Sequence, residues 1–262
     1  MEAAPHSVTC RYCGKTFETT DTRKMYCNKQ HADRARNGTN LVNLPTQPGT
    51  ITDLKDFRKL TDQGKQCVLL GQEQFRIVSF DLECTHLKPN VGRILCSSFK
   101  PLDGEVYSFN ALQRKFMKHD VWDDAELAAA IRDELMKYDI IVGWNSKMFD
   151  IKFLNGRNLR ANQRTKDAQY HVDGLTQWRS KTSAWGRLDS VQKFVAPDIG
   201  SKTEVEWPQW MRAIGWNKKM RDTAMQDIIT HCEIDVTVLE EVYKLMVLNN
   251  CVRSLRKDGG IA

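Results

Sequence analysis

The sequence predicts an α/β fold, in which helices flank a sheet, preceded by a small cysteine-rich module. Residues 139–144 (DIIVGW) form a continuous apolar run of strand length, which is typical of a strand buried on both faces of a sheet. Residues 123–138 begin with acids and then carry apolar residues four apart, which indicates an amphipathic helix. Alternation of such strands and helices along the chain favours α/β architecture.

Composition sets the outer limits of the prediction. A chain of 262 residues with 41% apolar residues suits one large domain, or one ordinary domain plus a small module. No apolar run approaches the length of a membrane span, and the N-terminus lacks the apolar segment of a secretory signal. We therefore expect a cytoplasmic protein, in a host's cytoplasm if the gene is viral, with no membrane partner. The formal charge of +6 favours a polyanionic partner without identifying one.

The first 36 residues predict a zinc site. Cys10-x2-Cys13 is followed after thirteen residues by Cys27-x3-His31, and two close pairs of such ligands are typical of a closed tetrahedral zinc site. The stretch resembles short treble-clef zinc fingers, although that family usually ends in C-x3-C, and His31 stands here at the last ligand position. We expect residues 1–36 to hold one structural Zn²⁺. Such fingers serve nucleic-acid binding, protein docking or structure alone.

Residues 37–65 are expected to connect this finger to the main domain. The segment 37–49 is rich in Asn, Thr, Pro and Gly, which indicates a linker. Residues 52–60 predict a short helix capped by Thr52.

The main domain is expected over residues 66–250, with a basic tail at 251–262. A helical period of apolar residues predicts a long helix near its end. The expected strands are 66–70, 75–83, 93–99, 105–109 and 139–144, and the long helix is 221–249.

The strand at 75–83 (FRIVSFDLE) ends in two carboxylates. Side chains alternate along a strand, so Asp81 and Glu83 share a face. Like charges this close make each other harder to ionise, and carboxylate oxygens of this kind suit Mg²⁺ or Mn²⁺. The alternative is an exposed strand end with two solvated acids.

The second motif follows the apolar run 139–144. Asn145 is placed to cap a helix whose buried stripe begins at Phe149. Asp150 then lies at the edge of that stripe, where it could face a cleft. The alternative is a capped helix with one surface aspartate.

The third motif lies within the long helix. His231 and Asp235 are four residues apart and so share one helix face, which supplies an acid for a cation and a base for water. The alternative is a solvated polar face, since Thr230, Glu233 and Thr237 are also polar.

The order D-x-E, N-x3-F-D and H-x3-D resembles the DEDD superfamily of 3′→5′ exonucleases, which share a ribonuclease H-like fold. Residues 170–195 (YHVDGL…WGRLDSVQKFV) resemble the later part of the proofreading exonuclease domain of family B DNA polymerases. The four-residue offset of the last motif also matches that branch. The resemblance covers roughly residues 70–248 and implies a mixed sheet flanked by helices. That branch normally has tyrosine at the position of His231, and the histidine branch places its histidine five residues before the aspartate.

The resemblance also implies a mechanism with two Mg²⁺ or Mn²⁺ ions. Asp81 would bridge both ions, Glu83 and Asp235 would hold the ion that binds the attacking water, and Asp150 would hold the other. His231 would orient or deprotonate that water. The product would be a 5′-nucleoside monophosphate. Glu233 belongs to neither pattern and is treated as a surface residue.

Asn145 and Phe149 are candidates for shaping a pocket for the terminal nucleotide, although capping and core packing explain them equally. Aromatic residues interleaved with cations suit stacking on unpaired bases, but such tryptophans can also be core residues. The candidate cations are Arg157, Arg160, Arg164, Lys166, Arg179, Lys181, Arg212, Lys218 and Lys219, and the tryptophans are Trp178, Trp185, Trp207, Trp210 and Trp216.

These features together predict a metal-dependent 3′→5′ exonuclease acting on single-stranded nucleic-acid ends in DNA replication, proofreading or repair. The resemblance favours DNA over RNA. No polymerase domain fits in 262 residues, so a partner polymerase or other replication protein is expected. The alternatives are an RNA-trimming exoribonuclease and a non-catalytic zinc-finger protein that binds nucleic acid.

Overall fold

The computed structural model describes residues 6–9, 16–21, 24, 51–71, 74–116, 123–184, 186–199, 205–252 and 254–257. The chain divides into two compact units, Met1–Thr50 and Ile51–Ala262. In the first unit, β1 (His6–Thr9) pairs antiparallel with β2 (Thr16–Thr19). The predicted zinc ligands Cys10, Cys13, Cys27 and His31, and the predicted linker 37–49, lie outside the described residues.

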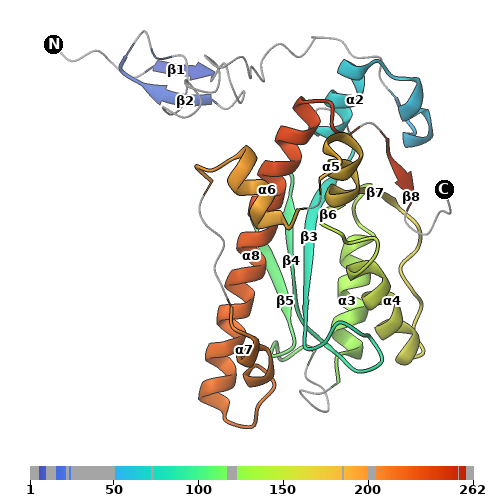
Figure 1. The fold of residues 1–262 in the computed structure, drawn as a ribbon, viewed down its shortest axis with the longest axis vertical. Helices are drawn as coiled ribbons and strands as arrows, with labels where there is room; N and C mark the ends of the chain where they lie inside the picture. The colour runs from blue at the N-terminus through green and yellow to red at the C-terminus, as the bar shows by residue number, and fades with distance from the viewer. Residues whose placement is uncertain are drawn as a thin grey trace. The chain divides into compact units, whose positions relative to one another are not determined.

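The second unit is built on a six-stranded mixed sheet with the strand order β5-β4-β3-β6-β7-β8 (Figure 1). The central strand β3 pairs antiparallel with β4 and parallel with β6, and β7 continues the parallel part. The predicted α/β sheet is confirmed. The strands are β3 (Ile77–Cys84), β4 (Ile94–Pro101), β5 (Tyr107–Asn110), β6 (Ile140–Gly143), β7 (Tyr170–Asp173) and β8 (Arg256–Lys257).

Helices cover both faces of this sheet. Figure 1 shows the long helix α8 (Lys218–Leu248) along one side of the sheet, and α3 (Ala125–Leu135) with α4 (Asp150–Arg160) on the other side. The shorter helices are the 3₁₀ helix η1 (Leu54–Lys59), α2 (Asp62–Leu69), α5 (Gly174–Thr182), α6 (Leu188–Val195) and α7 (Trp207–Arg212).

The apolar period of α8 divides between two hydrophobic clusters. Met225 and Ile228, in its first half, belong to the cluster that also holds apolar residues of β3, β4, α3 and α4. Val242 and Met246, in its second half, pack with β6, β7, η1 and α2. Because α8 spans both clusters, its middle segment, which carries His231 and Asp235, is held against the sheet.

The strand predicted at 66–70 is wrong, because these residues form the end of α2. The Thr61 side chain accepts a hydrogen bond from Gly64 N at 3.1 Å and caps the helix. Cys67, Val68 and Leu69 are buried. An apolar run this short fits a strand or a buried helix equally, and the cap decides between them.

The ends of the main domain also differ from the expected limits of 66 and 250. Leu54 and Phe57, in η1, and Val252 and Leu255, near the other end, are buried in the second cluster. The cap of η1 is Asp53 rather than Thr52, since the Asp53 carboxylate accepts from Lys55 N at 2.9 Å.

In the part of the chain that the structure describes, no helix combines the length and hydrophobicity needed to cross a membrane.

Candidate active site

The end of β3 presents its two acids to α8. Phe80 and Leu82 are buried in the first hydrophobic cluster. Asp81 and Glu83, which alternate with them along the strand, are half-buried. The Cys232 thiol of α8 lies 3.5 Å from Asp81 Oδ2 and donates toward that carboxylate. The alternation of the strand therefore turns both acids toward the helix that carries the third motif.

His231 lies between an acid from β3 and an acid from its own helix. Its Nε2 atom is 3.6 Å from Glu83 Oε1 and 3.9 Å from Asp235 Oδ2. His231 and Asp235 are both buried, so this face of α8 is not the solvated face that we considered as the alternative.

Trp210 of α7 completes this contact. Its indole N–H donates to Glu83 Oε2 at 3.2 Å, and its ring meets the His231 ring edge-on, with the ring centroids 6.3 Å apart. Trp210 therefore contacts both Glu83 and His231, and it limits the rotation of both side chains.

Asp150 is the first residue of α4, directly downstream of β6, and is only 4% exposed. β6 runs parallel to β3, so the carboxyl ends of both strands meet at one edge of the sheet. Burial raises the pKa of Asp150 well above its usual value, and the negative charges of Asp81, Glu83 and Asp173 raise it further. The alternative of a surface aspartate is excluded.

Asn145 does not cap α4. It is exposed and adopts a left-handed backbone conformation with φ 62°, and its carbonyl accepts from Met148 N and Phe149 N, both at 3.1 Å. A tight turn thus separates β6 from α4. The half-buried Phe149 packs against Phe153, with ring centroids 5.8 Å apart, as a core residue does.

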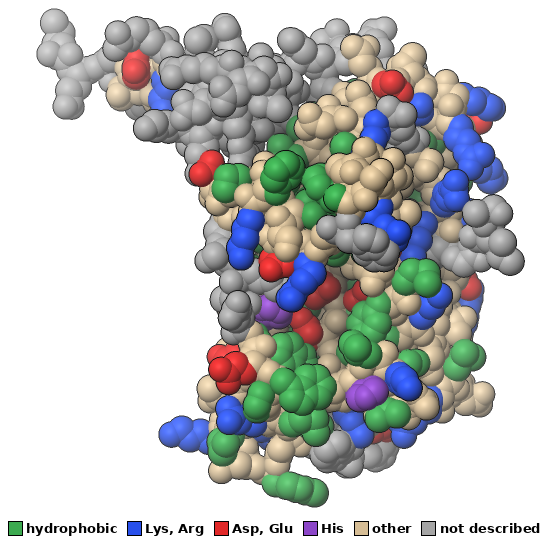
Figure 2. All heavy atoms as spheres, viewed as in Figure 1, with side chains coloured by type: hydrophobic (Ala, Val, Ile, Leu, Met, Phe, Trp, Pro, Cys, Tyr) green, Lys and Arg blue, Asp and Glu red, His purple; other side chains and the backbone are tan. Residues whose placement is uncertain are grey.

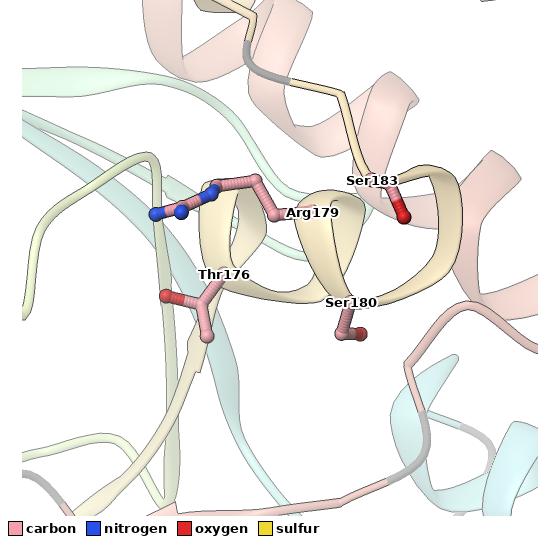
Figure 3. Close-up of a pocket in the computed structure, with 4 residues that line it drawn as sticks. All are labelled: Thr176, Arg179, Ser180 and Ser183. Atoms are coloured by element: carbon pink, nitrogen blue, oxygen red, sulfur yellow. The ribbon is translucent and has the colours of Figure 1, made fainter.

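A cavity of about 590 Å³ opens beside the acids. Asp81 and Asp235 line it together with Trp144, Asn145 and Arg187. Figure 2 shows acidic side chains and a histidine gathered in a hollowed part of the face toward the viewer, with Lys and Arg side chains beside them. A smaller pocket of about 320 Å³ is lined by Thr176, Arg179 and Ser180 of α5 and by Ser183, which follows the helix (Figure 3).

The donor set suits hard divalent cations, since four carboxylates from β3, α4 and α8 supply oxygen ligands in a region of negative charge. Among the described residues, however, no three His, Cys, Asp or Glu side chains lie close enough together to hold a metal ion as they stand. The chemistry fits Mg²⁺ or Mn²⁺, and binding would have to draw the carboxylates closer together.

Two of the predicted nucleic-acid contacts are wrong. Arg157 is buried, and its Nε atom donates to both Asp124 oxygens, at 3.0 and 2.8 Å. Lys166 is also buried, and its Nζ donates to Asp167 O at 3.0 Å. Both cations therefore stabilise the fold.

The remaining predictions divide between surface and core. Glu233 is half-buried rather than a surface residue, since Ser108 Oγ donates to its Oε1 at 2.6 Å. Trp207 and Trp216 are exposed, at 61% and 92%, whereas Trp178 and Trp210 are half-buried, and Trp185 lies outside the described residues.

Three residues of the site were not assigned to it from the sequence: Cys232, Arg187 and, as a partner of Glu83, Trp210. Cys232 follows His231 directly, and Arg187 lies in the segment that resembles a polymerase exonuclease, so both positions carried a signal. Nothing in the sequence pairs Trp210 with Glu83, because 127 residues separate them.

The chain is similar to one protein family and to a solved structure. No curated protein sequence matches the chain. Among solved structures, a family B DNA polymerase from the hyperthermophilic archaeon Pyrobaculum calidifontis is similar, with a TM-score of 0.49 and 18% identity. The similarity covers 64% of this chain and 24% of the polymerase chain. The profile of the RNase_H superfamily matches residues 78–247, which include all three motifs, and the predicted ribonuclease H-like fold is thereby confirmed. The chain belongs to the RNase_H superfamily.

Proposed function

We propose that this protein is a metal-dependent 3′→5′ exonuclease that releases 5′-nucleoside monophosphates from single-stranded nucleic acid. Membership of the RNase_H superfamily supports nuclease activity in general. The observation that carries the proposal is the convergence of acids from β3, α4 and α8, with His231 between two of them and with Asp81 and Asp235 lining one cavity. The direction of cleavage rests on the resemblance of the three motifs to the DEDD exonucleases.

The residues divide the chemistry among themselves. Bound divalent cations would supply Lewis-acid stabilisation of the charge that develops on the phosphate, and would lower the pKa of water so that it can lose a proton and attack the phosphorus atom. Asp81, Glu83, Asp150 and Asp235 would hold these cations through their carboxylate oxygens. His231 Nε2 would accept the proton of the attacking water or orient that water.

Trp210 serves the same chemistry indirectly. Its N–H fixes one oxygen of Glu83 and leaves the other directed to His231. A carboxylate held in this way loses less rotational freedom when it binds a cation.

Single-stranded DNA is the proposed substrate, because the motif resemblance is to the exonucleases of DNA polymerases. An RNA-trimming enzyme and a non-catalytic binding protein are the competing functions. A polymerase or another replication protein is the proposed partner, because the motif resemblance is to the proofreading exonucleases of DNA polymerases.

The direct experiment follows a 5′-labelled single-stranded DNA in Mg²⁺ or Mn²⁺. The proposal predicts a ladder that shortens from the 3′ end, and its loss in Asp235→Asn. Asp227→Asn is the matched control, because Asp227 is an exposed acid on the same helix whose Oδ2 accepts a hydrogen bond from Gln209 Nε2 at 3.0 Å, away from the site. Shortening of RNA but not DNA would favour the exoribonuclease. No shortening of either, with binding retained, would favour the non-catalytic protein.

The N-terminal segment adds a second, independent proposal. Cys10, Cys13, Cys27 and His31 are proposed to hold one structural Zn²⁺ by the spacing of their two pairs. Replacing Cys10 and Cys13 with Ser should release the zinc, measured by metal analysis, and leave the trimming of short single strands largely intact. Loss of all trimming by a folded double variant would show that the finger takes part in the chemistry.

A further inference from the structure

The cavity that Asp81 and Asp235 line also contains a cationic side chain, which has no part in the catalysis proposed above. Among the described residues that line the cavity, Arg187 is the one cation. Its side chain is 82% exposed, and it lies just before α6, on the segment that joins α5 to α6. A negatively charged ligand entering between the two acids would be repelled by them, and Arg187 is the group placed to offset that repulsion.

The backbone on both sides of Arg187 is anchored. Trp144 Nε1, at the end of β6, donates to Gly186 O at 3.1 Å, and Leu188 is buried in the second hydrophobic cluster. A side chain at Gly186 would also meet Val191, because a Cβ there would lie 2.6 Å from Val191 Cγ2. The exposed guanidinium is therefore carried by a segment whose position the fold fixes.

The ion pair that Arg187 makes within the protein can be exchanged for a contact with a ligand. Its Nε atom lies 3.4 Å from Asp189 Oδ1, and such an ion pair on an exposed side chain contributes little stability. A guanidinium presents a planar fork of N–H donors that matches the oxygens of a phosphate. A phosphate group can therefore take the place of Asp189 as the partner of Arg187.

Another part of the cavity wall is apolar. Trp144, Leu175 and Leu188 line the same cavity, and its volume of about 590 Å³ falls within the range of small-ligand sites. An aromatic ring and two aliphatic side chains suit the flat face of a base or the carbon face of a sugar. A cation next to an apolar surface therefore matches both the phosphate and the base or sugar of a nucleotide.

We infer that Arg187 binds the phosphate of the 3′-terminal nucleotide, while Trp144, Leu175 and Leu188 receive its base and sugar. The inference rests on the proposed function for the identity of the strand end, and it assigns Arg187 as a substrate-binding residue rather than as a group that takes part in proton transfer.

The test measures binding separately from hydrolysis. A fluorescent single-stranded DNA is titrated with the full-length protein in EDTA at several salt concentrations, and its anisotropy is followed. Arg187→Ala should weaken binding about tenfold and should make the logarithm of affinity less dependent on the logarithm of salt, by about 0.7 for one lost phosphate contact. Arg187→Lys should recover part of the affinity, since it keeps the charge and loses the fork.

Arg58→Ala is the matched control, because Arg58 is an exposed arginine in the last turn of η1 and does not line the cavity. This substitution should leave both the affinity and the salt slope nearly unchanged. Equal affinities and slopes for Arg187→Ala and Arg58→Ala would overturn the inference, as would a weakening with an unchanged salt slope.

A second readout identifies the phosphate as the bound group. Deoxyadenosine 5′-monophosphate should compete with the DNA better than deoxyadenosine does, and Arg187→Ala should abolish that difference. No difference in the unaltered protein would overturn the inference. The proposed function fails by another result, the absence of Asp235-dependent shortening in Mg²⁺ or Mn²⁺, so the two failures are distinguishable.

Discussion

Two groups of acidic side chains lie at α8, and the charged groups around them have opposite signs. Glu240, in the second half of the helix, is 2% exposed, and its two oxygens each lie 2.8 Å from a lysine, Lys100 and Lys244. The backbone N–H of Asp103 also donates to Glu240, at 2.7 Å. Positive charge and N–H donors thus offset the burial of this carboxylate.

The acids around His231 face one another. Burial raises the pKa of Asp150, and the negative charges of Asp81, Glu83 and Asp173 raise it further. An indole, an imidazole and a thiol contact the neighbouring acids, those of Trp210, His231 and Cys232. Mutual repulsion of this kind destabilises a fold, and it is typical of sites kept for function. The comparison separates a carboxylate whose charge is neutralised within the fold from the carboxylates that we propose to act in catalysis.

The largest expected effect is on catalysis. Asp81→Asn should lower hydrolysis of single-stranded DNA by about 10³-fold or more, because it removes the central cation ligand of the site. The variant should fold, since Asn keeps the shape and removes a repelling charge. Rates come from the 5′-labelled ladder, and circular dichroism checks the fold. Turnover within twofold or so of the unaltered protein would break the comparison.

The structural carboxylate should behave in the opposite way. Glu240→Gln should cost about 3 kcal/mol of unfolding free energy, because it leaves Lys100 and Lys244 close together without their shared anion. Its activity should stay near that of the unaltered protein at temperatures where both are folded. Urea unfolding measures the first quantity, and the ladder measures the second. A stable variant without activity would mean that this cluster also acts in catalysis.

The smallest effect sharpens the role of the indole. Trp210→Phe keeps an aromatic ring beside His231 and removes the N–H that bonds Glu83 at 3.2 Å. Activity should fall about tenfold, the worth of one hydrogen bond to a charged group. Trp207→Phe, on the exposed side of the same short helix, is the control and should change activity little. Equal effects of the two substitutions would remove Trp210 from the site.

The sequence predicted the parts of this fold that have strong periodicity. The strands around Asp81 and before Asn145, and the whole of α8, follow from apolar patterns that few other structures satisfy. The three motifs predicted where the acids would lie, because strand alternation and helical spacing fix which residues share a face. Local pattern carried less information at α2, where a short apolar run is compatible with a strand or a helix.

Contacts between distant segments could not be predicted in this way. Arg157 looked like part of a basic run, but its partner Asp124 is 33 residues away, on the approach to α3. Asn145 looked like a helix cap, but the turn after β6 uses its left-handed backbone instead. Trp210 reaches Glu83 only because α7 folds back over the start of α8. Each of these depends on how elements pack, which residue spacing does not encode.

The central claim is that the acids around Asp150 bind cations rather than stabilise the fold. Because its pKa is raised in the folded state, Asp150 contributes stability at low pH and loses it as the pH rises through that raised value. At neutral pH in EDTA, Asp150→Asn should therefore unfold at a higher temperature than the unaltered protein.

Thermal unfolding of both proteins, in EDTA and then in Mg²⁺ or Mn²⁺, is the most direct measurement. The account predicts that the cation raises the unfolding temperature of the unaltered protein by several degrees and that of Asp150→Asn by much less. A variant less stable than the unaltered protein in EDTA, with an equal response to the cation, would contradict it.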